Sequence, residues 1–396
     1  MPCRLVSGGT NPCRRRPHGQ DSECTVEPAG RRSAARADSS RPLHLRGALT
    51  AGFARGPGRR RWLVRVGRWG LATRVAGPLG ALLAGGCTLQ GGALRAPLPV
   101  DLPAAVELDA TPFFPQTAYQ CGPAALATAL GAVGIEVLPQ RLAELVFLPA
   151  RQGSLQVEML AGARRAGAVA TLIPGDLVAL LRELASGHVV VVLQNLGLDV
   201  APVWHYAVVV GYTLDAPELV LRSGTTRREH MGLSVFEHTW ARAGRWAFVA
   251  LPPGRWPATA QAAAAMEAAI GFERTAPPER ALQAYASAAR RWPGELALAM
   301  GVGNTAHAAG QRVLAAEAFA EAARRFRSAP AWINLGRTLL GADLPESAWR
   351  VALEAEYLAD PAWRRETTAL LRDAAAARRS APAPASRTPA AAERGR

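Results

Sequence analysis

The chain has 396 residues, which is enough for two domains of ordinary size with extensions. Its formal net charge is +15, but residues 1–60 carry +8 and residues 61–87 a further +4, which leaves +3 for everything from Thr88 onward. The basic charge therefore belongs to the N-terminal part, and the remainder of the chain does not have the charge of a nucleic-acid-binding protein.

The first 87 residues divide into two segments of different composition. Residues 1–60 are rich in arginine, poor in apolar residues and without periodic pattern, so we predict a disordered basic leader. In residues 61–87, arginines up to Arg74 precede the short apolar stretch VAGPLGALLAGGC, a layout typical of a secretion signal and too short to span a membrane. Because such signals open a protein, we expect translation to begin near Val64 or Val66, which would leave the leader untranslated.

Cys87 closes this signal and follows the small residues Ala84, Gly85 and Gly86. This arrangement resembles the bacterial lipobox, whose cysteine is lipidated and becomes the mature N-terminus. The resemblance implies a lipid anchor on Cys87 and, since Thr88 rather than Asp follows, sorting to the outer membrane with the protein facing the periplasm. The alternative is an uncleaved apolar stretch with an incidental cysteine. Residues 88–105 contain several Gly and Pro and are predicted to be a tether.

Residues 106–256 predict an α+β domain in which helices come first and an antiparallel sheet second. A helix is expected from Cys121 to the glycines Gly131 and Gly134, and further helices over 139–147, 155–166 and 176–185. Strands are expected over 168–173, 188–196, 205–212, 218–223 and 245–252, because these runs are rich in Val, Ile, Leu and aromatic residues.

Beyond residue 257 the strand patterns stop and a helical pattern of small and aromatic residues recurs up to residue 373. Its copies begin at Ala281, Ala315 and Ala348, at spacings of 34 and 33 residues. The spacing and residue choice resemble the tetratricopeptide repeat, which implies an all-α repeat domain that binds a protein partner. The alternative is an ordinary alanine-rich helical bundle. Residues 374–396, rich in Ala, Pro and Arg, are predicted to be a disordered tail.

The candidate site begins with Cys121, which stands directly before Gly122 and Pro123 at the start of a predicted helix. Unpaired N–H groups at a helix N-terminus lower the pKa of a thiol, so we expect an ionisable nucleophile. A cysteine nucleophile also needs a base and donors for the oxyanion. His205, at the head of the strand HYAVVVGY, can be the base, and the Gln116 amide with the Cys121 N–H can be the donors.

This order of Gln, Cys-Gly-Pro and His at the head of a Val-rich strand resembles the papain-like family-39 cysteine peptidases, the double-glycine leader peptidases, over residues 113–251. The resemblance implies a polypeptide substrate, Cys121 as nucleophile, His205 as general base and Gln116 as the oxyanion-hole amide. Two features depart from the family: Gln116 lies five rather than six residues before the cysteine, and Ser223 stands where the family has an Asp that orients the histidine.

The sequence therefore leaves the identity of a third catalytic residue undetermined. Ser223 can accept a hydrogen bond from the imidazole but cannot stabilise imidazolium as a carboxylate does. The alternatives for the orienting group are Asp199, Asp215 and Asn195, which lie in predicted loops or at strand ends.

No cofactor or metal site is expected from the sequence. His188, His230 and His238 match no zinc spacing. Arg227 and Arg228 are predicted to lie in a solvated turn rather than an anion site. The chain has no lysine and hence no Walker-type phosphate loop, which excludes a built-in nucleotide-driven transporter.

The sequence thus predicts a lipid-anchored cysteine peptidase with a protein-binding repeat domain. Two other functions remain. One is an inactive envelope scaffold, favoured by the missing Asp and by a thiol of ordinary pKa. The other is an amidase or acyltransferase, which shares the acyl-enzyme intermediate with a peptidase.

Overall fold

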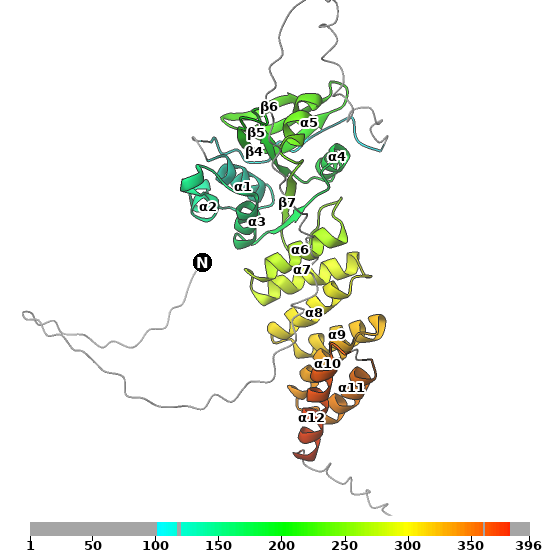
Figure 1. Ribbon diagram of the computed structural model, residues 1–396. Helices are drawn as coiled ribbons and strands as arrows, with labels where there is room; N and C mark the ends of the chain where they lie inside the picture. The colour runs from blue at the N-terminus through cyan, green and yellow to red at the C-terminus, as the bar shows by residue number, and fades with distance from the viewer. Residues whose placement is uncertain (1–100, 117–119, 359–360, 381–396) are drawn as a thin grey trace, which may run out of the picture. The chain divides into compact units, whose positions relative to one another are not determined.

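The computed structural model describes residues 101–116, 120–358 and 361–380 (Figure 1). The predicted leader, the signal segment with Cys87 and all but the last residues of the predicted tether lie outside the described residues.

An antiparallel sheet forms the centre of the first part of the described chain. Within that part it has seven strands in the order β2-β7-β3-β4-β5-β6, with β1 paired to the end of β4. The strands are β1 (Ala105–Glu107), β2 (Val169–Leu172), β3 (Val190–Asn195), β4 (Trp204–Thr213), β5 (Glu218–Ser223), β6 (Thr226–Gly232) and β7 (Ala247–Leu251). All of these pairings are antiparallel, which confirms the predicted α+β class.

Helices cover both faces of this sheet (Figure 1). They are α1 (Cys121–Gly131), α2 (Pro139–Val146) and α3 (Gln156–Arg165) on one face and α4 (Leu177–Ala185) and α5 (Leu233–Ala241) on the other. Alternate residues of β4 serve the two faces, since Tyr206 and Val208 pack with α1 to α3, whereas Ala207 and Val209 pack with α4 and α5. Burial on both faces explains the unbroken apolar runs of β3 and β4.

Three elements of this part were not predicted. β1 begins at Ala105, one residue inside the segment predicted as tether. Arg227 and Arg228, which were predicted to lie in a turn, belong to strand β6. β6 is an edge strand, where charged and exposed residues are common, so its sequence lacks the apolar pattern by which a strand is predicted. α5 is a short helix whose buried residues, among them Phe236 and Trp240, cover the sheet.

The second part of the described chain consists of helices that pack in sequence order, each against the next (Figure 1). They are α6 (Ala262–Glu273), α7 (Pro278–Arg291), α8 (Leu296–Ala308), α9 (Arg312–Phe326), α10 (Ala329–Leu340), α11 (Pro345–Leu358) and α12 (Arg364–Ser380). The recurring residues Ala281, Ala315 and Ala348 are all fully buried. Small residues are therefore used where helices approach closely, as the periodic pattern predicts.

The last helix extends beyond the predicted end of the ordered chain. α12 continues to Ser380, and Ala374, where the disordered tail was predicted to begin, is fully buried. Arg378 pairs with Glu346 at 2.7 Å and lies over the Trp349 ring. Alanine favours helix, and these contacts hold the last turns, so the prediction was wrong for residues 374–380. The rest of the predicted tail lies outside the described residues.

The linker between the two parts is fixed by one buried carboxylate. Glu183 of α4 accepts hydrogen bonds from the backbone N–H groups of Ala258 and Thr259 at 3.0 and 2.6 Å and lies 2.8 Å from His188 Nδ1. Val169 of β2 adds an apolar contact, since it shares a core cluster with α6 residues such as Ala265 and Phe272.

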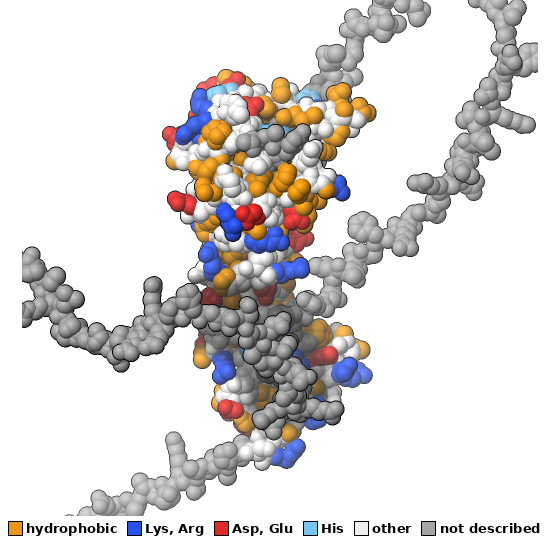
Figure 2. Space-filling model, turned by 90° about the vertical axis from the view of Figure 1, so that its left-hand side faces the viewer, with side chains coloured by type: hydrophobic (Ala, Val, Ile, Leu, Met, Phe, Trp, Pro, Cys, Tyr) orange, Lys and Arg blue, Asp and Glu red, His pale blue; other side chains and the backbone are white. Residues whose placement is uncertain are grey.

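The charge on the described surface is mixed. On the face seen in Figure 2, acidic and basic side chains are interspersed rather than gathered into one basic patch. Among the helices of the described residues, none has the length and apolar character needed to span a bilayer.

We predict that Glu183→Gln will lower the free energy of unfolding by about 1–3 kcal/mol, because an amide nitrogen would face the N–H donors of the linker. Burial raises the pKa of Glu183, but its hydrogen bonds outweigh this and hold the pKa below 4.5. The stabilisation is therefore present above about pH 4.5 and is lost as the pH falls through the folded-state pKa. Chemical denaturation at pH 7 and pH 4 measures both effects, and Glu144→Gln, at an exposed ion pair, is the control.

Candidate active site

Cys121 is the first residue of α1 and is partly buried. The helix has no side-chain cap at Gln120, and Pro123 lies in the first turn, where an N–H has no helical partner. Gly122 is required by packing, because a Cβ there would lie 2.7 Å from the Ser154 Cβ and overlap the Ser154 hydroxyl. The Cys-Gly-Pro sequence thus places the sulfur at the helix start, with Ser154 packed against the next residue, Gly122.

The thiol of Cys121 lies against the start of β4. Cys121 packs against the buried cluster that contains Tyr206. Burial raises the pKa of the Cys121 thiol, and the backbone N–H groups of Tyr206, Gly122 and Cys121 itself lower it to a smaller extent. The expectation that the helix N-terminus would lower the thiol pKa is therefore wrong for this resting geometry, because desolvation disfavours the thiolate more than the N–H groups favour it.

His205 is the second residue of β4 and directly precedes Tyr206. The Nε2 atom of His205 lies 2.9 Å from the Ser223 Oγ on β5. With a proton on Nε2 the ring donates to this hydroxyl and keeps Nδ1 as the basic nitrogen. Burial lowers the pKa of His205, with a smaller opposing effect from the Glu229 carboxylate, so the imidazole is neutral at pH 7.

In the structure, the side chain that contacts the His205 ring is that of Ser223. Asn195 is engaged in its own loop, where its Oδ1 accepts from the N–H groups of Gly197 and Val203. Asp215 follows the far end of β4, ten residues long, and Asp199 lies exposed in the loop between β3 and β4. The Glu229 carboxylate of β6 raises the pKa of His205 slightly, and this residue was not a candidate because the neighbouring Arg227 and Arg228 were predicted to form a turn.

Gln116 is held by its backbone at the turn that follows Ser223. Its N–H donates to the carbonyl oxygen of Gly224 at 3.0 Å. The backbone of Gln116 is therefore anchored to Gly224, the residue that follows Ser223. Residues 117–119, between Gln116 and α1, lie outside the described part.

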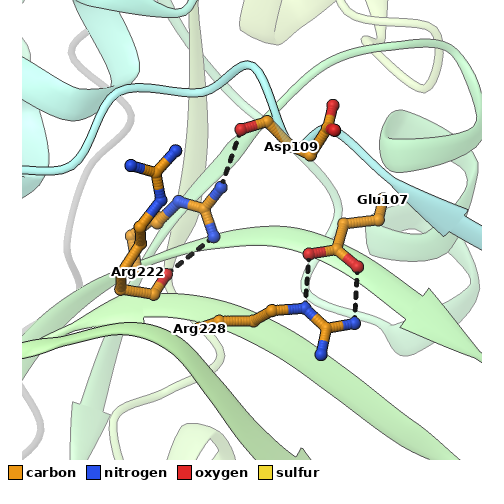
Figure 3. Close-up of a pocket in the computed structure, with 5 residues that line it drawn as sticks. Glu107, Asp109, Arg222 and Arg228 are labelled. Carbon is orange, nitrogen blue, oxygen red and sulfur yellow. Dashed lines mark hydrogen bonds and ion pairs between the residues drawn. The ribbon is translucent and has the colours of Figure 1, made fainter.

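A charged pocket of about 500 Å³ lies beside this turn (Figure 3). Arg228 binds Glu107 through two hydrogen bonds of 2.7 Å, and this interaction holds the pKa of Glu107 below its usual value. Arg228 is thus an ion-pair partner on a strand, and not a residue of the predicted turn. Arg222, the other labelled arginine in Figure 3, is buried and donates to backbone carbonyl groups.

The three histidines weighed for a metal site each have a local partner. His188 contacts Glu183, His230 lies 3.2 Å from Glu218, and His238 contacts the Ser234 carbonyl. Within the described ranges, no group of three or more His, Cys, Asp or Glu side chains is placed to hold a metal ion.

No family model and no curated protein matches the chain. Among solved structures, a crystallised protein from Bacillus anthracis described as a "putative C39-like peptidase" is similar at 18% identity, covering 38% of this chain and 98% of that chain with a TM-score of 0.32.

We predict that Ser223→Asp will raise the pKa of His205 by about one unit or more, because a carboxylate within 4–6 Å favours imidazolium. In the unsubstituted protein, proton titration followed by NMR should give His205 a pKa below 6.5. Ser186→Asp, at an exposed helix end, is the control. An identical His205 titration in the Ser223→Asp variant would show that this hydroxyl is not the neighbour of the ring in solution.

A second prediction concerns the packing of Ser154 against Gly122, the residue after Cys121. Gly122→Ala should slow alkylation of Cys121 by iodoacetamide at least several-fold and lower the thermal midpoint, because the new methyl group overlaps Ser154. Adding Ser154→Gly should recover much of both losses, since it removes the overlapping atoms. Failure of the double variant to recover either property would contradict this account of Gly122.

Proposed function

We propose that this chain is a cysteine peptidase in which Cys121 is the nucleophile and His205 the general base. The observation that carries the proposal is the arrangement at the start of β4. Cys121 packs against the cluster that contains Tyr206, and the preceding residue, His205, is held through Nε2 by Ser223, which would leave Nδ1 to take the thiol proton.

The resting pair is neutral, because burial raises the pKa of the thiol and lowers that of the imidazole. Proton transfer therefore accompanies attack. His205 Nδ1 takes the thiol proton while Sγ forms a bond to the scissile carbonyl carbon. The C–N bond then breaks, and the leaving amine takes the proton from His205. A water molecule, deprotonated by His205, attacks the thioester, which releases the carboxylic acid and restores the thiol.

The oxyanion of each tetrahedral intermediate needs donors. We assign this role to the Cys121 backbone N–H and the Gln116 side-chain amide. The Gln116 backbone is anchored at Gly224, beside the partner of His205, and this supports the assignment.

A polypeptide substrate agrees with the surface next to His205. The loop between β3 and β4 and the first residue of β4 expose apolar side chains, with exposed fractions of 67% for Leu198, 91% for Val200 and 55% for Trp204. The hydrogen bonds of Asn195 fix the base of this loop. Apolar side chains of an extended peptide would bury this surface on binding.

The remaining parts of the proposal are an anchor and a binding module. Residues 106–256 would form the peptidase domain, and residues 257–373 a tetratricopeptide-like domain that binds a protein partner, in accord with the serial packing of α6 to α12. Lipidation of Cys87 would hold the protein at the outer membrane, facing the periplasm.

A second candidate is a non-catalytic envelope scaffold that binds peptides without cleaving them. Two observations favour it: the raised pKa of the Cys121 thiol and the presence of Ser223 in place of a carboxylate. An amidase or acyltransferase would use the same Cys121 and His205, because the acyl-enzyme is common to all three reactions.

The test is digestion of a proteome-derived peptide library by the full chain, with new termini identified by mass spectrometry. We expect cleavage by the unsubstituted protein and a loss of at least about a thousandfold in Cys121→Ala and His205→Ala, because each removes a reacting group. His238→Ala, at an exposed histidine of α5, should cleave normally.

Other outcomes separate the candidates. Retention of library peptides without new termini would replace the peptidase with the scaffold. Products formed only when an added amine or alcohol accepts the acyl group would replace it with an acyltransferase.

A further inference from the structure

Residues 108–116, here called the strap, connect β1 to Gln116. The strap begins where the Leu108 N–H donates to the Val210 carbonyl on β4, at 2.8 Å. It ends where the Gln116 N–H donates to the Gly224 carbonyl beyond the end of β5, at 3.0 Å. The strap therefore passes from β4 to β5, and its course sets where Gln116 enters the candidate active site.

Arg222 of β5 lies under the strap and is only 3% exposed. Its guanidinium donates to the strap carbonyl groups of Asp109 at 3.1 Å and Thr111 at 3.4 Å, and to the Arg227 carbonyl at 2.6 Å. Figure 3 shows the bonds to Asp109 and Arg227. These acceptors belong to two different segments, so one side chain ties the strap to the start of β6.

A buried arginine held by backbone carbonyl groups is a costly way to fill space, since an apolar side chain of similar volume would avoid desolvating a charge. Burial lowers the pKa of Arg222, with a further contribution from the neighbouring charge of Arg227. An apolar residue, however, would not supply the hydrogen-bond donors of the Arg222 guanidinium. The guanidinium fork holds two strap carbonyl groups at once, which fixes the direction of that backbone as well as its position.

The two residues that follow Arg222 complete the arrangement. Ser223 contacts His205 Nε2 at 2.9 Å, and the Gly224 carbonyl accepts from the Gln116 N–H. Three consecutive residues at the end of one strand thus hold the strap, the general base and the oxyanion-hole residue. A shift of the strap relative to β5 would move Gln116 relative to His205.

We propose that Arg222 is a positioning residue that acts through the strap to place the Gln116 amide for oxyanion binding. This inference rests on the proposed function and adds to it a residue remote from the reacting atoms. It separates two properties of the site: Arg222 governs stabilisation of the oxyanion, whereas the thiol and imidazole are held by other contacts.

Two probes measure these properties separately on the full chain. A peptide aldehyde forms a hemithioacetal with a cysteine nucleophile, and its oxygen occupies the oxyanion position. Iodoacetamide alkylates the same sulfur without forming an oxyanion. We expect Arg222→Met to raise the inhibition constant of the aldehyde at least about tenfold, as expected for a misplaced oxyanion donor, while the alkylation rate changes less than about twofold.

Controls distinguish positioning from general stability. Arg291→Met removes a similar guanidinium, which binds the carbonyl groups of Pro257 and Ala258 at 2.7 Å, and should leave both probes unchanged. Arg222→Lys keeps the charge but not the fork, so an intermediate inhibition constant is expected. If Arg222→Met does not fold, Arg222→Lys carries the test.

A double-variant cycle with Gln116→Ala identifies the route of the effect. If Arg222 acts through Gln116, the loss in aldehyde affinity from Arg222→Met should largely disappear in the Gln116→Ala background. Independent, additive losses would overturn the positioning role, as would equal losses for both probes. An unsubstituted chain that fails to bind the aldehyde at all would instead overturn the proposed peptidase function.

Discussion

The candidate site depends on the end of β5, because Ser223 contacts His205 there and the next residue, Gly224, holds the backbone of Gln116. β5 pairs with β4 along most of its length, and helices cover both faces of this part of the sheet. A strand held in this way changes position little, so Ser223 can fix an imidazole and Gly224 can fix the backbone of Gln116. The remaining group, Cys121, is on α1, and it packs against the cluster that contains Tyr206 of β4.

Electrostatics at this site are decided by burial rather than by the helix. The N-terminus of a helix stabilises a negative charge by about 0.3–1 kcal/mol, rising to about 2 kcal/mol in favourable settings. Full burial can shift a pKa by about 3–5 units, and one unit corresponds to about 1.4 kcal/mol. Partial burial is therefore enough to outweigh the helix at Cys121. In the proposed reaction, the dipoles of a bound substrate would shift the protonation equilibrium of the Cys121 thiol. The thiol therefore does not have to be ionised before the substrate binds.

Much of the first part of the fold could be predicted from the sequence. The Val-rich runs identified the central strands, and Asp176 was recognised at the start of α4, where its side chain accepts from the Ala179 N–H at 2.8 Å. β6 could not be found, because its charged residues suit an exposed edge and do not alternate with apolar ones. The composition of residues 374–396 predicted disorder from residue 374, whereas the helix continues to Ser380. Its last turns are held by contacts of Arg378 with residues of α11, which are not evident from the local sequence.

The site was predictable only to the extent that it follows chain order. Cys121, His205 and Ser223 were identified as candidates, and the structure brings His205 and Ser223 together. Arg222 was not identified, since an arginine at the end of a strand normally faces solvent and its partners lie far away in the sequence. The direction in which the pKa of the Cys121 thiol shifts could not be predicted from the sequence either, because it depends on how far other segments of the chain bury the sulfur.

The shared core around Val169 has a consequence for the behaviour of the whole described chain. An apolar residue of the sheet completes the core of the first helices that follow, and Glu183 fastens the linker between them. Separating the two parts would expose apolar surface and leave a buried carboxylate without its donors, so they are expected to melt as one cooperative unit. Any protein that binds and stabilises the helices would then also make the sheet harder to unfold, by mass action alone.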